Sequence, residues 1–246
     1  MSDATRAVVD ELVAHLRSLR SERDIAGKRI CKAELQREFG LDPDIDVPLI
    51  GFVNRLTYQK MADVVLDVLP RLIANDVQVV VHGEGDREFE ERFASVAHAH
   101  PANVAVRVGY TEALAHRIVG GCDLSLTPAR FEPCGLTTMY AMRYGAPPIT
   151  HAVGGIVDTV EDAGEVEAEH HAGSGFTFGA TTADDLGRCL MRAASWYDDQ
   201  ESWKQLQRRA MARDFGWERS ARRYLELYAA LVSDARQNEE QQRQCR

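Results

Sequence analysis

The sequence has few cysteines, and none of them is spaced as a metal-binding or redox pair. The five cysteines, Cys31, Cys122, Cys134, Cys189 and Cys245, contain no C-x-x-C motif. An odd number of scattered cysteines does not fit a disulfide framework. We therefore expect reduced thiols and no metal site, as in a cytoplasmic protein.

Long apolar runs and an excess of positive charge are also absent. No stretch approaches the ~20 apolar residues that a membrane-spanning helix needs, and the polar, acidic start does not resemble a signal peptide. The net charge of −9 disfavours a general attraction to nucleic acid or anionic membrane, because both are negative. We expect a cytoplasmic protein that binds neither nucleic acid nor membrane, so any phosphate site must be local.

The composition is sufficient for one large hydrophobic core. Hydrophobic residues make up 45% and charged residues 27% of the 246 residues, as in ordinary globular proteins. This length allows one large domain with appendages, but not two doubly wound domains of the usual size. We expect an N-terminal helical extension over 1–26 with an amphipathic helix at 6–20, a domain over 27–235, and a polar tail over 236–246.

A regular alternation of apolar runs and amphipathic segments begins at Val47. The apolar runs PLIGFV, VQVVVHG, VAVRVG, CDLSLTP and APPIT predict buried strands. The amphipathic segments predict helices over 62–73, 87–97, 112–119 and 136–144, and further helices are predicted over 32–39, 182–196, 201–213 and 217–233, with a loop at 161–175. The predicted fold is therefore α/β, a doubly wound parallel sheet of Rossmann-like type with extra N- and C-terminal helices.

Ligands of such sheets bind beyond the carboxyl ends of the strands, so the residues after each run are candidates. After PLIGFV, Arg55 and Lys60 flank the start of a helix, where two cations suit a diphosphate. After VQVVV, Gly83 permits a tight turn, and Tyr110 follows the next run. The alternatives are solvated surface charges for the cations, a structural turn for Gly83, and core packing for Tyr110.

The segment ARFEPCGLTT follows the fourth run. Glu132 precedes a proline, which restricts it to an extended conformation and presents its carboxylate at the rim of the sheet. Cys134, Gly135 and Leu136 lead into a helix, where Thr137 is a donor to a phosphate oxygen. The alternative for Glu132 is an acid placed to interact with the helix dipole.

A further glycine turn, Gly154 and Gly155 in AVGGIVDTV, precedes another helix. It suits the approach of a phosphate or ribose, and it suits a plain connection between a strand and a helix equally well.

Several motifs together resemble consecutive segments of bacterial glycogen synthases and plant starch synthases, which are retaining glycosyltransferases with two Rossmann-like domains, the GT-B fold. They are GKRICKAELQREFGL, PLIGFVNRLTYQK, HGEGD, GYTEALAHRIVGGCDLSLTPARFEPCGLTTMYAMRYGAPPI, GGIVDT, GSGFTF and DFGWERSARRYLELY. RFEPCGLT is the most specific of them. The resemblance extends from about Gly27 to about Tyr228, the C-terminal half of that fold.

The resemblance implies roles for these residues. Arg55 and Lys60 match the cations on the nucleotide diphosphate, and Glu132 matches the carboxylate that faces the donor glucose. The remaining matches are Tyr110 beside the adenine, Thr137 at a phosphate, and Cys134, Gly135 and Leu136 in the turn around the sugar. Met61 departs from the family, in which glycine often follows the lysine.

The resemblance also implies a donor, an acceptor and a partner. The donor is ADP-glucose, with UDP-glucose as the alternative, and neither a cofactor nor a metal is required. The acceptor is an α-1,4-glucan, held by an N-terminal domain with a KxGG motif that has no match in this sequence. We therefore expect a chain that is inactive alone and associates with a partner catalytic domain, or a non-catalytic nucleotide-sugar-binding module.

Overall fold

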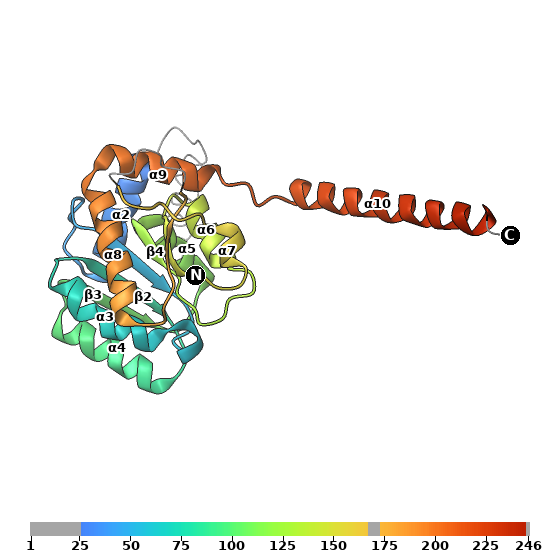
Figure 1. Cartoon of the computed structure of the whole chain (residues 1–246). Helices are drawn as coiled ribbons and strands as arrows, with labels where there is room; N and C mark the ends of the chain where they lie inside the picture. The colour runs from blue at the N-terminus through green and yellow to red at the C-terminus, as the bar shows by residue number, and fades with distance from the viewer. Residues whose placement is uncertain (1–25, 167–172, 245–246) are drawn as a thin grey trace, which may run out of the picture. The chain divides into compact units, whose positions relative to one another are not determined.

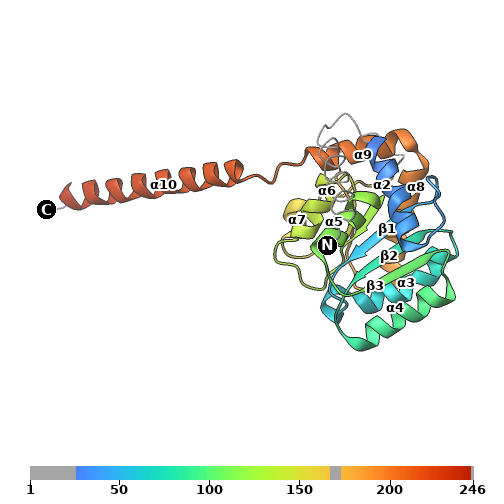
Figure 2. The same cartoon turned by 180° about the vertical axis from the view of Figure 1, so that it is seen from behind.

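A six-stranded sheet, with its strands paired in parallel, lies between two layers of helices (Figures 1 and 2). The computed structural model describes residues 26–166 and 173–244, so the helix predicted at 6–20 lies outside the described residues. The strand order is β3-β2-β1-β4-β5-β6. The strands are β1 Leu49–Val53, β2 Gln78–Gly83, β3 Val104–Val108, β4 Leu124–Leu126, β5 Pro148–His151 and β6 Phe176–Phe178.

The helices follow the strands as the alternation predicts. They are α2 Ala26–Phe39, α3 Ala62–Ile73, α4 Arg87–Ala99, α5 Glu112–Gly121, α6 Leu136–Arg143, α7 Ile156–Thr159, α8 Ala183–Asp198 and α9 Gln200–Ala212, with a 3-10 turn η1 at Tyr58–Lys60. The predicted doubly wound fold and its first five strands are therefore confirmed.

Successive residues of each buried strand enter different cores, because side chains of a strand point alternately to its two faces. In β2, Val79 and Val81 pack in the larger core with α3, α4 and α8, whereas Val80 packs in the smaller core with α2, α5 and α6. Both faces are thus covered, which explains why the strands are apolar runs without polar alternation.

The sequence-based prediction was wrong in three places. The helix predicted over 32–39 begins earlier, because α2 covers Ala26–Phe39. The prediction also assigned residues 161–175 to a loop without a strand after it, but Phe176–Phe178 form the edge strand β6, which pairs with β5. A strand this short carries too little periodicity to be recognised. The helix predicted over 217–233 extends further, because α10 runs over Trp217–Gln244.

The chain divides after Arg213 into two compact units, earlier than the boundary expected at residue 235. The second unit, Asp214–Arg246, contains α10. Apolar side chains of α10 are exposed, among them Trp217, Tyr224, Leu225, Tyr228 and Leu231. No helix within the described residues is both long and apolar enough to cross a membrane.

A buried ion pair attaches α2 to the sheet. The Lys32 ammonium lies 2.7 Å from an Asp123 carboxylate oxygen, and their side chains are 1% and 10% exposed. Lys32 also donates to the Tyr197 hydroxyl at 2.9 Å, and Asp123 accepts from the Leu49 amide at 2.9 Å. Burial raises the pKa of the Asp123 carboxyl, although Lys32 beside it acts in the opposite direction. The pair thus joins α2 to the starts of β1 and β4.

A second buried lysine of α2 stabilises the ends of two other helices. Lys28 donates to the Gly120 carbonyl of α5 at 3.1 Å and to the Tyr144 carbonyl after α6 at 3.2 Å. A cation at a helix C-terminus satisfies carbonyls that have no partner within the helix. Burial lowers the pKa of Lys28.

We predict that Lys32→Met destabilises the protein by about 3–5 kcal/mol, because it leaves Asp123 buried without its counter-charge. The free energy of unfolding in urea measures this. Arg37→Met is the matched control on the same helix, since Arg37 pairs with Glu34 at the exposed surface. We expect the control to change the free energy of unfolding by about 0–1 kcal/mol. An equal effect of the two substitutions would contradict a large contribution of the buried Lys32–Asp123 pair to stability.

Candidate functional site

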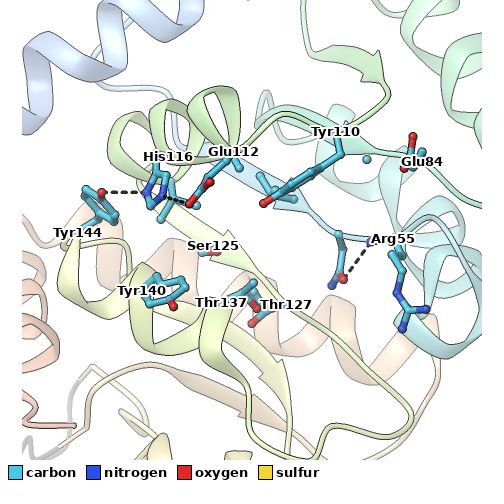
Figure 3. Close-up of a pocket in the computed structure, with 15 residues that line it drawn as sticks. Arg55, Glu84, Tyr110, Glu112, His116, Ser125, Thr127, Thr137, Tyr140 and Tyr144 are labelled. Carbon is cyan, nitrogen blue, oxygen red and sulfur yellow. Dashed lines mark hydrogen bonds and ion pairs between the residues drawn. The ribbon is translucent and has the colours of Figure 1, made fainter. Parts of the chain in front are cut away.

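A pocket of about 400 Å³ opens at the carboxyl ends of β1, β2 and β4 (Figure 3). The chain runs from β1 to β2 and β3 on one side of the sheet, and β4 lies on the other side of β1. Such a switch point is where open parallel sheets bind ligands. The pocket is lined by Val53, Asn54, Arg55, Gly83, Glu84, Tyr110, Glu112, Ala115, His116, Val119, Ser125, Thr127, Thr137, Tyr140 and Tyr144.

Four of the predicted site residues, Arg55, Gly83, Tyr110 and Thr137, therefore lie in the pocket wall. Arg55 is exposed, and its guanidinium donates to the Gln59 side-chain oxygen at 3.1 Å. Figure 3 shows Arg55 at the opposite end of the pocket from Tyr144. The pocket thus has a cationic end and an aromatic end.

Lys60 and Glu132 form an ion pair beside this pocket. The Lys60 ammonium lies 2.6 Å from Oε2 of Glu132, although the two residues are 72 positions apart in the sequence. Oε1 of Glu132 accepts from the Gly135 amide at 3.1 Å. Burial favours the neutral acid, but Lys60 and the amides of Gly135 and Cys134 outweigh it and lower the pKa of the Glu132 carboxyl. The site therefore holds a carboxylate and an ammonium in contact.

The turn after Glu132 leads into the pocket. Gly135 precedes α6 in a left-handed conformation with φ of +77°, which favours glycine. Cys134 and Leu136 are exposed on either side of it, and Thr137 in the first turn of α6 reaches the pocket. The start of α6 thus connects the Lys60–Glu132 pair to the pocket.

The predicted glycine turns pack closely against neighbouring backbone. A Cβ atom on Gly83 would lie 1.8 Å from the Asn54 carbonyl oxygen, and one on Gly154 would lie 2.1 Å from that of Glu132. The Gly155 amide donates to the same Glu132 carbonyl at 3.0 Å. These contacts give a structural reason for the glycines. A role for them in ligand binding stays a prediction, and the Gly154–Gly155 turn supports the loop of Glu132.

Tyr110 is 59% exposed, so its ring is not part of the core. It stacks on His82 with the ring centroids 5.9 Å apart and the planes 12° from parallel. His82 accepts from the Thr111 amide through Nε2 at 3.2 Å, and its Nδ1 lies 2.9 Å from the Arg107 carbonyl. One ring nitrogen thus accepts a backbone N–H and the other faces a backbone carbonyl, so hydrogen bonds at both nitrogens fix the orientation of the imidazole. The imidazole thus backs the tyrosine at the pocket wall.

Sequence reasoning missed two polar pairs in the pocket. His116 Nδ1 lies 2.9 Å from the Tyr144 hydroxyl, and its Nε2 lies 3.7 Å from a Glu112 carboxylate oxygen. Tyr140 lines the same wall. Glu112 with His116, and Tyr140 with Tyr144, are each four residues apart on a predicted helix and therefore share one face. In the sequence, this four-residue spacing in a helix that follows a strand end could have indicated these polar residues of the site.

Met61 shows why glycine is usual at this position of the motif. Its φ of +55° is left-handed, which costs a side-chain-bearing residue ~1–2 kcal/mol. The Met61 side chain is fully buried in the larger core, and such burial contributes about 1.5–3 kcal/mol. Burial therefore offsets the backbone strain, and Lys60 keeps its place at the end of η1.

Chemically, the site combines the cations Arg55 and Lys60, the carboxylates of Glu84, Glu112 and Glu132, a helix start and an aromatic wall. Cations and helix amides stabilise phosphate oxygens, and aromatic rings stack on bases. No group of three or more His, Cys, Asp or Glu side chains placed to hold a metal ion occurs in the described part of the chain.

Comparisons with known proteins agree with this arrangement. The family model of glycosyl transferases group 1 matches residues 36–211. The glycogen synthase of Burkholderia thailandensis is 49% identical over 212 residues, which are 85% of this chain and 40% of that protein. The glycogen synthase of Anaeromyxobacter dehalogenans strain 2CP-C is 48% identical over 218 residues, 89% of this chain and 45% of that protein. The chain thus spans less than half the length of these curated relatives.

Among solved structures, the catalytic domain of starch synthase IV from Arabidopsis thaliana bound to ADP and acarbose is similar, with a TM-score of 0.77 and 33% identity. The match covers 86% of this chain and 44% of that one. The Anabaena protein HepE in complex with UDP-glucose has a TM-score of 0.58 at 18% identity, covering 74% of this chain and 47% of that one, which shows a shared fold.

The family match, the relatives and the strand-end site agree with the resemblance found in the sequence motifs. The chain belongs to the glycosyl transferases of group 1 and is a homologue of glycogen synthases over about half of their length.

Proposed function

We propose that this chain is the donor-binding half of a glycogen or starch synthase that uses ADP-glucose. The full enzyme would transfer glucose to the 4-hydroxyl of an α-1,4-glucan with retention of anomeric configuration. The observation that carries the proposal is the contact of Lys60 with Glu132 at 2.6 Å beside a pocket that contains Arg55 and Tyr110. These groups match the parts of one ligand: a base, a diphosphate and a sugar.

The ligand would lie along the pocket with its base against Tyr110. Tyr110, 59% exposed and backed by His82, offers a face for adenine. Arg55 in the pocket wall and Lys60, five residues later at the end of η1, suit the diphosphate, and Thr137 adds a hydroxyl donor. The glucose would then lie against Glu132 and the turn that contains Cys134 and Gly135.

The chemistry of such a site is mainly positional and electrostatic. Arg55 and Lys60 would stabilise the charge that develops on the departing diphosphate. Lys60 has three N–H donors, so it can bind a phosphate oxygen without giving up its bond to Glu132. We assign Glu132 to orienting the sugar and to electrostatic support, because its carboxyl is ionised and already paired with a cation.

The acceptor site and closure of the active site would come from the remaining part of the longer enzyme. The chain spans 40% and 45% of the two glycogen synthases described above. We infer that the glucan and the partner domain meet the donor across the face that carries the pocket.

We predict that ADP binds the chain much more tightly than adenosine does, because Arg55 and Lys60 bind the diphosphate. Arg55→Ala/Lys60→Ala should weaken ADP binding by at least about a hundredfold, since charge-assisted hydrogen bonds contribute ~1.5–3 kcal/mol each. Isothermal calorimetry measures both affinities. Arg92→Ala/Lys204→Ala removes the same charge at exposed positions and should leave ADP affinity unchanged. Equal ADP binding by the first double variant and the wild type would refute the phosphate assignment.

We predict that ADP-glucose slows alkylation of Cys134 more than ADP does, because the turn around Cys134 would contact the sugar. Cys134 is exposed, whereas Cys31, Cys122 and Cys189 are buried and serve as internal references. Mass spectrometry of the labelled peptide gives the rate. Unchanged labelling under saturating donor would exclude this turn from the sugar site.

We predict that the 246-residue chain binds the nucleotide but transfers no measurable glucose to glycogen by itself. Alignment of reacting groups in a closed cleft accounts for ~7–11 kcal/mol of barrier lowering, and the acceptor half would supply that alignment. Radiolabelled ADP-glucose is incubated with glycogen and the chain, with and without a KxGG-containing N-terminal domain of a homologue. Robust incorporation by the chain alone would contradict the half-enzyme proposal.

A further inference from the structure

Arg130 joins the two loops that carry Lys60 and Glu132. Its backbone amide donates to the Gln59 carbonyl at 2.8 Å, and its guanidinium donates to the Tyr58 carbonyl. The guanidinium also lies over the Tyr58 ring, 3.6 Å from the centroid. Arg130 therefore contacts the η1 segment in three ways: a backbone hydrogen bond, a side-chain hydrogen bond and a cation–π contact.

Asp63 holds Arg130 in this orientation. The two carboxylate oxygens of Asp63 accept from Nη1 and Nη2 of Arg130, each at 2.8 Å, in a planar two-pronged pair. Such pairs fix direction as well as distance, which a lysine in the same place does not. Asp63 lies in the first turn of α3, directly after η1. The Arg130 guanidinium is thus held in one orientation by the first turn of α3.

We call Arg130 and Asp63, with their contacts to η1, the clamp. The charged side chains of the site lie close to the clamp in sequence. Lys60 follows Gln59, and Glu132 lies two positions after Arg130. Arg130 itself does not belong to the pocket wall in the described structure. A displacement of the clamp would therefore move Lys60 relative to Glu132 without removing any group from the pocket.

We propose that Arg130, held by Asp63, is a positioning residue that keeps the Lys60 ammonium and the Glu132 carboxylate in contact. The effect on ligand binding rests on the proposed function: the contact between Lys60 and Glu132 would let one ligand bind Lys60 through its diphosphate and Glu132 through its sugar. The clamp itself acts whether or not that ligand is correctly named.

The test compares Asp63→Asn and Arg130→Lys with Asp67→Asn. Asp67 lies one turn further along α3 and pairs with Arg92 at the surface at 3.6 Å, so it is a matched control. The first readout is titration of the Glu132 carboxyl by NMR on the full chain with ¹³C-labelled glutamate, assigned with Glu132→Gln. Because Lys60 lowers the pKa of Glu132, a broken clamp raises that pKa towards its ordinary value.

The second readout is affinity. We expect Asp63→Asn and Arg130→Lys to weaken ADP-glucose binding by about tenfold or more and to leave AMP binding near wild type, because AMP lacks the second phosphate and the sugar. Asp67→Asn should change neither affinity nor the Glu132 titration. A clamp that merely stabilises the fold would shift the unfolding transition and move neither readout.

The outcomes separate the two proposals. If the wild-type chain binds no ADP-glucose, the proposed function fails, and the Glu132 titration still decides the clamp. If the near-ultraviolet circular dichroism shows that Asp63→Asn is unfolded, the positioning role is tested with Arg130→Lys, which keeps the positive charge. Titration of Glu132 at the wild-type pKa in the folded variants would overturn the positioning role.

Discussion

The adjacency of β1 and β4 is the constraint on which the site depends. These two strands pair in parallel, Ile50 with Leu124 and Gly51 with Ser125, so their carboxyl ends open at the same edge. The loop after β1 carries Arg55 and Lys60, and the loop after β4 carries Glu132. Two segments that are distant in sequence thus bring opposite charges to within 2.6 Å, because the strand order reverses between them.

Rigid attachment of the surrounding helices supports this arrangement. The Lys32–Asp123 pair links α2 to the starts of β1 and β4, the strands whose other ends form the site. Lys28 ties α2 to the ends of α5 and α6, whose residues line the pocket. Buried charges are costly unless they are paired, so these lysines also specify where α2 must lie.

Several large apolar side chains close to the site in sequence or in the pocket wall are exposed. Tyr58, Tyr110, Phe131, Leu136 and Tyr140 are each more than half exposed. Apolar side chains gathered at one surface are typical of places that bind a ligand or another domain. Both uses are consistent with a chain that spans less than half of its homologues.

The sequence by itself determined the alternation of strands and helices, the strand-end position of Arg55, Tyr110, Glu132 and Thr137, and the family, because periodicity and motifs are local properties of the chain. It did not reveal β6, whose three residues carry too little pattern, nor the full length of α10. The pairing of Lys60 with Glu132 across 72 positions, and of Asp63 with Arg130 across 67, was decided by the tertiary structure. Such pairs depend on strand order and on the orientation of loops, which packing of the whole sheet fixes and no neighbouring residues encode.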